Sequence, residues 1–195
     1  PWLWLIAGPN GAGKSTYAPN LSSEVDEIVR PDELAHQISP GDPDSAAMRA
    51  GRLAVKRIGD LLAEKKSFAI ETTLSGRFHL EAARQAKSGG WNFGIVYIGL
   101  RSPAIAIARV RLRKLRGGHN VPRADVLRRY RRSLVNLAGI YKIADRLVVL
   151  DNSSSRTPMK RLLETLNGEI VFRSRPLPEW LTAALGPVLK RRSKS

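Results

Sequence analysis

A glycine-rich segment near the start of the chain has the residue types and spacing of a phosphate-binding loop. It reads GPNGAGKS from Gly8 to Ser15 and lies between an apolar stretch and a candidate helix. Glycines let consecutive backbone N–H groups turn inward around a phosphate, Lys14 can reach the β- and γ-phosphates, and the Ser15 hydroxyl is the expected Mg²⁺ ligand. This complete Walker A pattern predicts binding of ATP or GTP. The residues expected at the nucleotide are Gly8, Pro9, Asn10, Gly11, Ala12, Gly13, Lys14, Ser15 and Thr16.

Two carboxylates follow predicted strands and could complete the chemistry. Asp32 comes after a short strand in VRPDELA, and Glu71 ends another strand in FAIETT. If the strand that ends at Glu71 lies beside the first strand, Asp32 could accept a hydroxyl proton near the γ-phosphate, and Glu71 could hold Mg²⁺ or its waters. Each residue also has a purely structural explanation, because Asp32 could be only a helix N-cap and Glu71 only a solvated strand end.

A block of basic residues supplies the third group of candidates. Residues 101–132 hold 11 Lys and Arg against Asp125 alone, whereas residues 1–100 hold 11 basic and 11 acidic residues, so the net charge of +16 is local. A block of this density either contacts phosphates or keeps a helix surface solvated. On a helix over 104–116, the spacing i, i+4 and i+7 places three arginines on one flank of the apolar stripe: Arg109, Arg113 and Arg116.

The connection after this helix, RGGHNVP, resembles a hinge between two helices. The second helix carries Arg129, Ser133 and Asn136 beside its apolar face. An arginine-bearing hairpin of this kind could close over the phosphates as a lid that excludes water and stabilises the transferred charge. We expect two or three of the basic residues to be functional and His119 to have a structural or substrate-orienting role. Those expected to point elsewhere are Arg111, Lys114, Arg128 and Arg131.

Composition limits the class of protein. Apolar residues make up 43% and charged residues 26% of the 195-residue chain, which indicates a globular domain without a membrane span of about 20 apolar residues. There is no cysteine, which excludes disulfides, thiolate metal sites and a cysteine nucleophile, and favours a reducing cytoplasm. The opening PWLWLIA is too short for a signal-peptide core and predicts a buried strand.

Short β-branched or aromatic runs alternate with helical stretches along the chain. Strands are expected at 2–7, 27–30, 67–71, 92–98, 146–150 and 169–173, and helices at 14–21, 32–38, 45–65, 77–88, 103–116, 122–140, 158–166 and 178–185. The alternation predicts an α/β fold, a P-loop kinase-like three-layer sandwich with a mostly parallel sheet and a helical, arginine-rich lid. One domain is expected over 1–186, with a basic tail over 187–195. Pro19 should kink or end the first helix early.

Five motifs occur in an order and at spacings that match a known family: AGPNGAGKST, RPDELA, IETTLSG, RGGHNVP with RRYRRSLVNL, and AD with LDNS. Between Trp2 and Ser153 the chain resembles the zeta-toxin family of P-loop kinases, in particular its short, single-domain bacterial branch. The resemblance implies an ATP- and Mg²⁺-dependent phosphotransferase related to the toxins that phosphorylate UDP-N-acetylglucosamine. It also implies an antitoxin, and an acidic helical partner would suit so basic a surface.

The resemblance implies roles for single residues as well. It places Lys14 on the phosphates, Ser15 on Mg²⁺ and the catalytic base at Asp32. It places Glu71 and Thr73 near the substrate, and lid arginines at the γ-phosphate.

The lid departs from the family pattern. The larger toxins carry two well-separated lid arginines; Arg109 is one candidate here, and Arg116 or His119 stands where the second is sought. The chain is also shorter than the larger family members, which leaves less structure to recognise a UDP-sugar.

Two other classes of protein share some of these features. A polynucleotide or other nucleic-acid-directed P-loop kinase would use the basic block, but Tyr130 is the only aromatic residue in it, so the usual stacking platforms for single strands are missing. A nucleotide-gated ATPase without an acceptor would need no base at Asp32. A salt titration of binding and an analysis of reaction products separate these classes from a small-molecule kinase.

Overall fold

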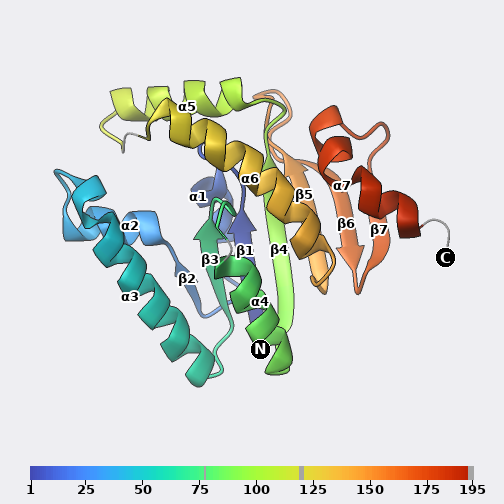
Figure 1. The fold of residues 1–195 in the computed structure, drawn as a ribbon, viewed down its shortest axis with the longest axis horizontal. Helices are drawn as coiled ribbons and strands as arrows, with labels where there is room; N and C mark the ends of the chain where they lie inside the picture. Colours follow the sequence, from blue (N-terminus) through green and yellow to red (C-terminus); the bar gives the residue numbers. More distant parts are fainter. Residues whose placement is uncertain (77, 119–120, 193–195) are drawn as a thin grey trace.

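The computed structural model describes residues 1–76, 78–118 and 121–192, and its strands form one seven-stranded sheet (Figure 1). The order across the sheet is β2-β3-β1-β4-β5-β6-β7. The first five strands pair in parallel, and the last two add antiparallel at one edge. The strands are β1 (Trp2–Ala7), β2 (Glu27–Val29), β3 (Phe68–Thr72), β4 (Asn92–Gly99), β5 (Arg146–Asp151), β6 (Lys160–Leu166) and β7 (Glu169–Arg173). The predicted mostly parallel sheet is confirmed, and β3 lies beside β1, which is the condition under which Glu71 could reach the nucleotide.

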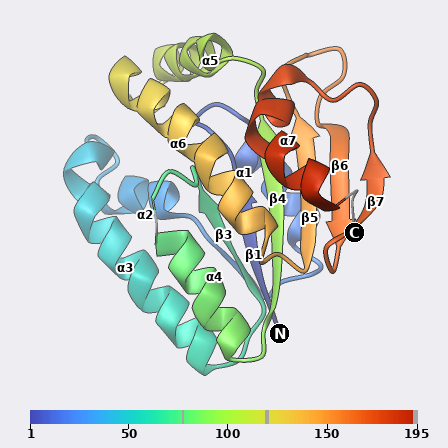
Figure 2. The same cartoon turned by 45° about the vertical axis from the view of Figure 1, so that its right-hand side comes forward.

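Helices cover both faces of the sheet and complete the predicted three layers (Figures 1 and 2). One face is packed by α3, α4, the end of α6 and α7, and the other by α1, η1, α5 and the start of α6. Within the described residues, none of the helices is long and apolar enough to cross a membrane. The helices are α1 (Lys14–Tyr17), the 3-10 helix η1 (Ala18–Leu21), α2 (Pro31–Ile38), α3 (Pro43–Ala63), α4 (Phe78–Ser88), α5 (Pro103–Leu115), α6 (Arg123–Tyr141) and α7 (Glu179–Arg192).

The central strand β1 shows how the sequence forms this core. Successive side chains of a strand point to opposite faces, so Leu3 and Leu5 enter one core cluster while Trp4 and Ile6 enter the other. All four side chains are buried. A strand that is apolar on both faces is typical of a parallel sheet covered by helices on each side.

Prolines set the start of several helices and the end of the first. Pro31 and Pro103 occupy the first turn of α2 and α5, where the missing N–H costs no hydrogen bond. Helix α1 ends at Tyr17, and Pro19 lies in the short 3-10 helix that follows. The predicted early end of this helix is confirmed.

Two predictions about the carboxyl-terminal part were wrong. The helix predicted at 158–166 is the strand β6, which pairs with β5 and carries Glu164 against Arg146. Cross-strand pairing with a buried neighbour outweighs a local pattern of leucines that suits a helix equally well. Helix α7 continues past Gly186 and includes Pro187, so the segment predicted as a tail from 187 is helical to Arg192. It continues because three leucines one turn apart are all buried on one face: Leu181, Leu185 and Leu189.

Candidate active site

The loop between β1 and α1 has the shape of a phosphate-binding loop. Gly8 and Gly13 have φ values of 147° and 95°, in the region that favours glycine. A Cβ on Gly8 would overlap the carbonyl oxygen of Ile98 on β4, and one on Gly13 would lie 2.7 Å from the Asn152 Nδ2 atom. The loop is therefore packed directly against neighbouring backbone and side chains, which leaves room for glycine only.

Lys14 begins α1 and lies buried across this loop. Its Nζ atom donates a hydrogen bond to the Pro9 carbonyl oxygen over 3.2 Å. Burial lowers the pKa of Lys14, while the negative charges of Glu71 and Asp32 act in the opposite direction. A buried ammonium group with one carbonyl partner retains the capacity to bind an anion, and phosphate oxygens would stabilise its charged form.

The end of β3 brings Glu71 to the P-loop. Ile6 of β1 stands opposite Glu71 in the parallel pairing, and the Ser15 hydroxyl donates a 3.0 Å hydrogen bond to Glu71 Oε1. The other oxygen, Oε2, is buried without a hydrogen-bond partner, and the Arg30 Nε atom lies 3.9 Å away. Glu71 is thus not the solvated strand end that was one explanation of its position.

This pair fits the chemistry of Mg²⁺. The cation takes hard oxygen ligands, keeps several waters and is bound by one or two protein groups together with substrate phosphates. A hydroxyl beside a carboxylate with an unsatisfied oxygen supplies such a partial site. The described residues contain no group of three or more His, Asp or Glu side chains that could hold a metal ion alone.

Asp32 lies in the first turn of α2, near enough to Lys14 for its negative charge to act on the pKa of that lysine. Arg30 is the N-cap residue of α2 and Pro31 precedes Asp32 inside the helix, so Asp32 does not occupy the capping position. No side-chain hydrogen bond caps this helix. The structural explanation of Asp32 as an N-cap is therefore wrong, although its charge still suits the helix N-terminus.

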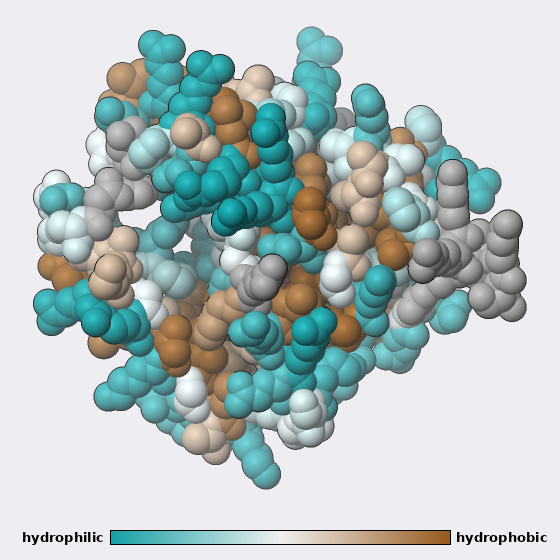
Figure 3. Space-filling model, in the orientation of Figure 1, coloured by the Kyte–Doolittle hydropathy of each residue, from teal (hydrophilic) through white to brown (hydrophobic). Residues whose placement is uncertain are grey.

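One cavity of about 870 Å³ joins these groups to the helical hairpin of α5 and α6. Figure 3 shows a hollow, rimmed by hydrophilic residues, between α2 on the left and α5 at the top. Lys14, Ser15 and Asp32 all line it. Within the described residues, no carboxylate forms an ion pair with the arginines that the hairpin contributes to the lining, Arg113, Arg116 and Arg129.

Arg109 has a different position from the one predicted. It does not line this cavity; its guanidinium donates to the Gly11 carbonyl over 3.2 Å and to the Asn152 carbonyl over 2.7 Å. Arg113 and Arg129 take the place in the lining expected for it. The sequence indicated both Arg113 and Arg129 as candidates, since each lies beside the apolar face of its predicted helix.

The remaining lid residues separate into two groups. Ser133 is buried against the Tyr97 hydroxyl, and Asn136 donates to the Leu74 carbonyl. Both side chains therefore attach helix α6 to the rest of the domain and do not line the cavity. Arg116 lines the cavity as predicted. His119, the alternative position for the second lid group, lies outside the described residues.

The end of the cavity beyond Glu71 is lined by small polar groups and an imidazole. Thr73, predicted near the substrate, shares a 2.9 Å hydrogen bond with Ser75. His79 of α4 also lines this end, and its Nδ1 atom is buried without a partner. Burial lowers the pKa of His79 to about 4, so the ring is neutral near pH 7. Sequence reasoning did not single out His79, because a histidine at a helix start has no diagnostic spacing.

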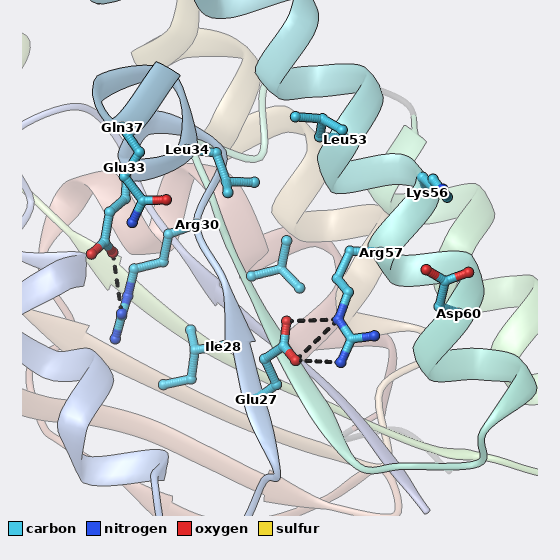
Figure 4. A pocket seen from close by; sticks show the side chains of 11 residues that line it. Glu27, Ile28, Arg30, Glu33, Leu34, Gln37, Leu53, Lys56, Arg57 and Asp60 are labelled. Atoms are coloured by element: carbon cyan, nitrogen blue, oxygen red, sulfur yellow. Dashed lines mark hydrogen bonds and ion pairs between the residues drawn. The ribbon is translucent and has the colours of Figure 1, made fainter. Parts of the chain in front are cut away.

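A second cavity, of about 560 Å³, lies between the edge strand β2 and helices α2 and α3. Figure 4 shows that two pairs of its charged groups contact each other, Glu27 with Arg57 and Arg30 with Glu33. Glu27 accepts hydrogen bonds from Arg57, the shortest of them 2.7 Å, and Arg30 donates to Glu33 over 3.2 Å. Because the carboxylates of Glu27 and Glu33 are already paired with arginines and no P-loop group reaches this cavity, the cavity at the P-loop is the candidate site.

Comparison with known proteins finds matches over the part of the chain that contains the P-loop. Residues 3–137 match the model of a family described as AAA domain. An uncharacterized protein of Haemophilus influenzae is 33% identical over 135 residues, which cover 66% of this chain and 96% of that protein.

Two solved structures share the fold at low sequence identity. A chain of the AvrRxo1-ORF1:-ORF2 complex with ATP superposes with a TM-score of 0.69 at 14% identity, over 87% of this chain and 60% of that one. A chain of the PezAT chromosomal toxin-antitoxin system of Streptococcus pneumoniae gives a TM-score of 0.61 at 16% identity, over 96% of this chain and 85% of that one. The chain thus spans less than two thirds of the AvrRxo1 chain, and the likeness shows a P-loop kinase-like fold.

Proposed function

The chain belongs to the AAA domain family, and on this premise we propose that it is an ATP-dependent phosphotransferase that transfers the γ-phosphate to a hydroxyl group of a small molecule. One observation carries the proposal. The same cavity is lined by the P-loop lysine, by the Ser15–Glu71 pair, by the Asp32 carboxylate, which does not cap its helix, and by arginines that form no ion pair with a carboxylate of the described residues. A bare ATPase would need the first two of these groups but not a base facing a separate acceptor space.

The nucleotide end of the cavity binds and orients ATP. Inward N–H groups of the P-loop and the Lys14 ammonium would hold the β- and γ-phosphates. Ser15 and Glu71 would hold Mg²⁺, which when bound neutralises charge on these phosphates. The buried position of Lys14 strengthens its attraction to a phosphate, because few waters compete for it.

Asp32 would act as the general base. Its carboxylate accepts the proton of the acceptor hydroxyl while the hydroxyl oxygen forms a bond to the γ-phosphorus and the bond to the ADP oxygen breaks. Because the Asp32 carboxylate does not cap helix α2, it is available to accept a hydrogen bond from the acceptor hydroxyl.

The hairpin arginines would stabilise the phosphoryl group in transit. Arg113, Arg116 and Arg129 line the same cavity as Lys14 and Asp32, where they can meet the negative charge spread over the transferred group. Closure of the hairpin would also exclude water, which protects ATP from hydrolysis.

The acceptor would occupy the end of the cavity at Glu71 and Thr73. We infer a zeta-type toxin that acts on a UDP-activated amino sugar, because the motifs of the sequence resemble that family and the fold is shared with a chain of a toxin-antitoxin system. The partner would be an acidic antitoxin, whose charge would speed its association with the basic hairpin.

Incubation with labelled ATP and a panel of acceptors tests this function. The panel contains UDP-sugars, nucleotides, dinucleotides and short oligonucleotides, and mass spectrometry detects a gain of one phosphoryl group. Transfer to a UDP-sugar is the expected result. Transfer only to oligonucleotides would favour the nucleic-acid-directed kinase, for which the basic block over 101–132 is the supporting observation. Release of ADP and free phosphate alone would overturn the transferase.

A further inference from the structure

Asn152, the first residue after β5, connects three parts of the structure behind the P-loop. Its backbone N–H donates to the Gly99 carbonyl over 3.0 Å, and its own carbonyl accepts the 2.7 Å bond from Arg109. Its side chain faces the P-loop: Nδ2 donates to the Ala12 carbonyl over 2.9 Å, and Oδ1 accepts from the Met159 N–H over 3.4 Å. Asn152 is therefore fixed by β4, α5 and its own loop before it touches the P-loop.

The bond to Ala12 has a geometric consequence for the next residue. A trans peptide is planar, so the carbonyl of Ala12 and the N–H of Gly13 point in opposite directions. Asn152 holds the carbonyl outward, and the Gly13 N–H must then point toward the inside of the loop. Inward N–H groups are what a P-loop offers to a phosphate.

Close packing makes this support rigid. A Cβ on Gly13 would lie 2.7 Å from Asn152 Nδ2 and 3.0 Å from the Met159 methyl group. The asparagine amide contacts the loop directly through its 2.9 Å bond to the Ala12 carbonyl, with no water between them. The neighbouring Gly11 carbonyl is held outward in the same way by Arg109, over 3.2 Å.

We propose that Asn152 is a positioning residue for nucleotide binding, which presents the Gly13 N–H to a nucleotide phosphate by holding the Ala12 carbonyl outward. The inference rests on the proposed function, since it needs a nucleotide in the P-loop. It goes further by assigning a role to a residue that touches neither the ligand cavity nor the reacting atoms.

Two variants separate this role from simple support of the loop after β5. Asn152→Ala removes both side-chain bonds. Asn152→Asp keeps an acceptor for the Met159 N–H but loses the donor to Ala12, and its carboxylate would repel that carbonyl. Ser154→Ala is the matched control, because it removes the bond to the Arg156 N–H in the same loop without touching the P-loop.

Calorimetric titration with ADP and Mg²⁺ measures the effect. We expect Asn152→Ala to bind ADP roughly 5- to 10-fold more weakly, Asn152→Asp at least as weakly, and Ser154→Ala like the wild type. If Asn152→Ala fails to fold, Asn152→Asp carries the test, and in amide NMR spectra its Gly13 N–H should shift less on ADP binding than in the wild type. Wild-type affinity in either Asn152 variant would overturn the positioning role alone. A wild-type protein that binds no ADP would overturn the proposed function with it.

Discussion

The Ser15 hydroxyl donates a 3.0 Å hydrogen bond to the Glu71 carboxylate, which joins the end of the P-loop to the end of β3. The bond exists because β3 lies next to β1, although 55 residues separate the two side chains along the sequence. A hydroxyl that donates to a carboxylate leaves its lone pairs free, and the carboxylate keeps one buried oxygen without a hydrogen-bond partner, with the Arg30 guanidinium 3.9 Å away. Both groups therefore have capacity for a cation.

Replacement of Glu71 by Gln tests this cation site. The amide oxygen can still accept from Ser15, but the negative charge is lost, so we expect Mg²⁺ to bind the ATP complex roughly 10- to 100-fold more weakly. A Mg²⁺ titration of activity or of ATP binding measures the change. Glu27→Gln is the control, because Glu27 pairs with Arg57 and does not line this cavity. Equal Mg²⁺ requirements in both variants would contradict the site.

Lys14→Ala should abolish nucleotide binding and leave the fold intact. The ammonium group is buried with a lowered pKa, so its removal costs the free protein little. Wild type at 100 times the dissociation constant of ATP should gain about 2.7 kcal/mol of stability, and the variant much less. Thermal melting with and without ATP and Mg²⁺ shows this, with Lys56→Ala as a surface control. A variant stabilised as strongly as the wild type would remove Lys14 from the phosphate site.

The arginines of the hairpin should divide into two kinds. Arg113→Ala, Arg116→Ala and Arg129→Ala should each lower kcat, by roughly 10²- to 10³-fold for a group that meets the transferred charge, with little change in KM for ATP. Arg109→Ala should instead raise KM for ATP, because it supports the P-loop backbone. Steady-state kinetics on an identified acceptor distinguish them. Near-normal turnover in the three cavity variants would show that these charges are merely solvated.

The different positions of Arg109 and of the three cavity arginines show which parts of the site could be predicted from the sequence. The parallel sheet, the P-loop and the two carboxylates followed from local patterns, because each of these groups lies at the end of a predicted strand, whereas the order of the strands in the sheet came from the structure. The direction of Arg109 did not, since it depends on where α5 passes the P-loop and on the carbonyls of Gly11 and Asn152 that it meets there. Strand β6 was missed for the same reason, because its partner β5 decides its structure.

His79 should make the protein sensitive to acid. Burial lowers its pKa from 6.5 to about 4 in the folded state, so the unfolded chain binds the proton more readily between these values. Stability should fall as the pH decreases from about 6.5 to about 4, by about 3 kcal/mol at most from this group. Denaturant unfolding across this range measures it. His79→Gln should flatten the dependence and His36→Gln, on the exposed side of α2, should not. The same slope in His79→Gln would contradict this assignment.

Asp32→Asn separates a kinase from a bare ATPase. Asparagine keeps the shape of the side chain at the start of α2 but cannot accept the proton of an acceptor hydroxyl, so transfer should fall roughly 10²- to 10⁴-fold. Folding and ATP binding should change little, because Arg30 and not Asp32 occupies the N-cap position. Melting temperature, ATP affinity and the rate of acceptor phosphorylation are measured on the same preparation. If transfer persists in Asp32→Asn while Glu71→Gln loses it without a change in Mg²⁺ requirement, the base is Glu71, and the cation must be held by Ser15 and the phosphates without it.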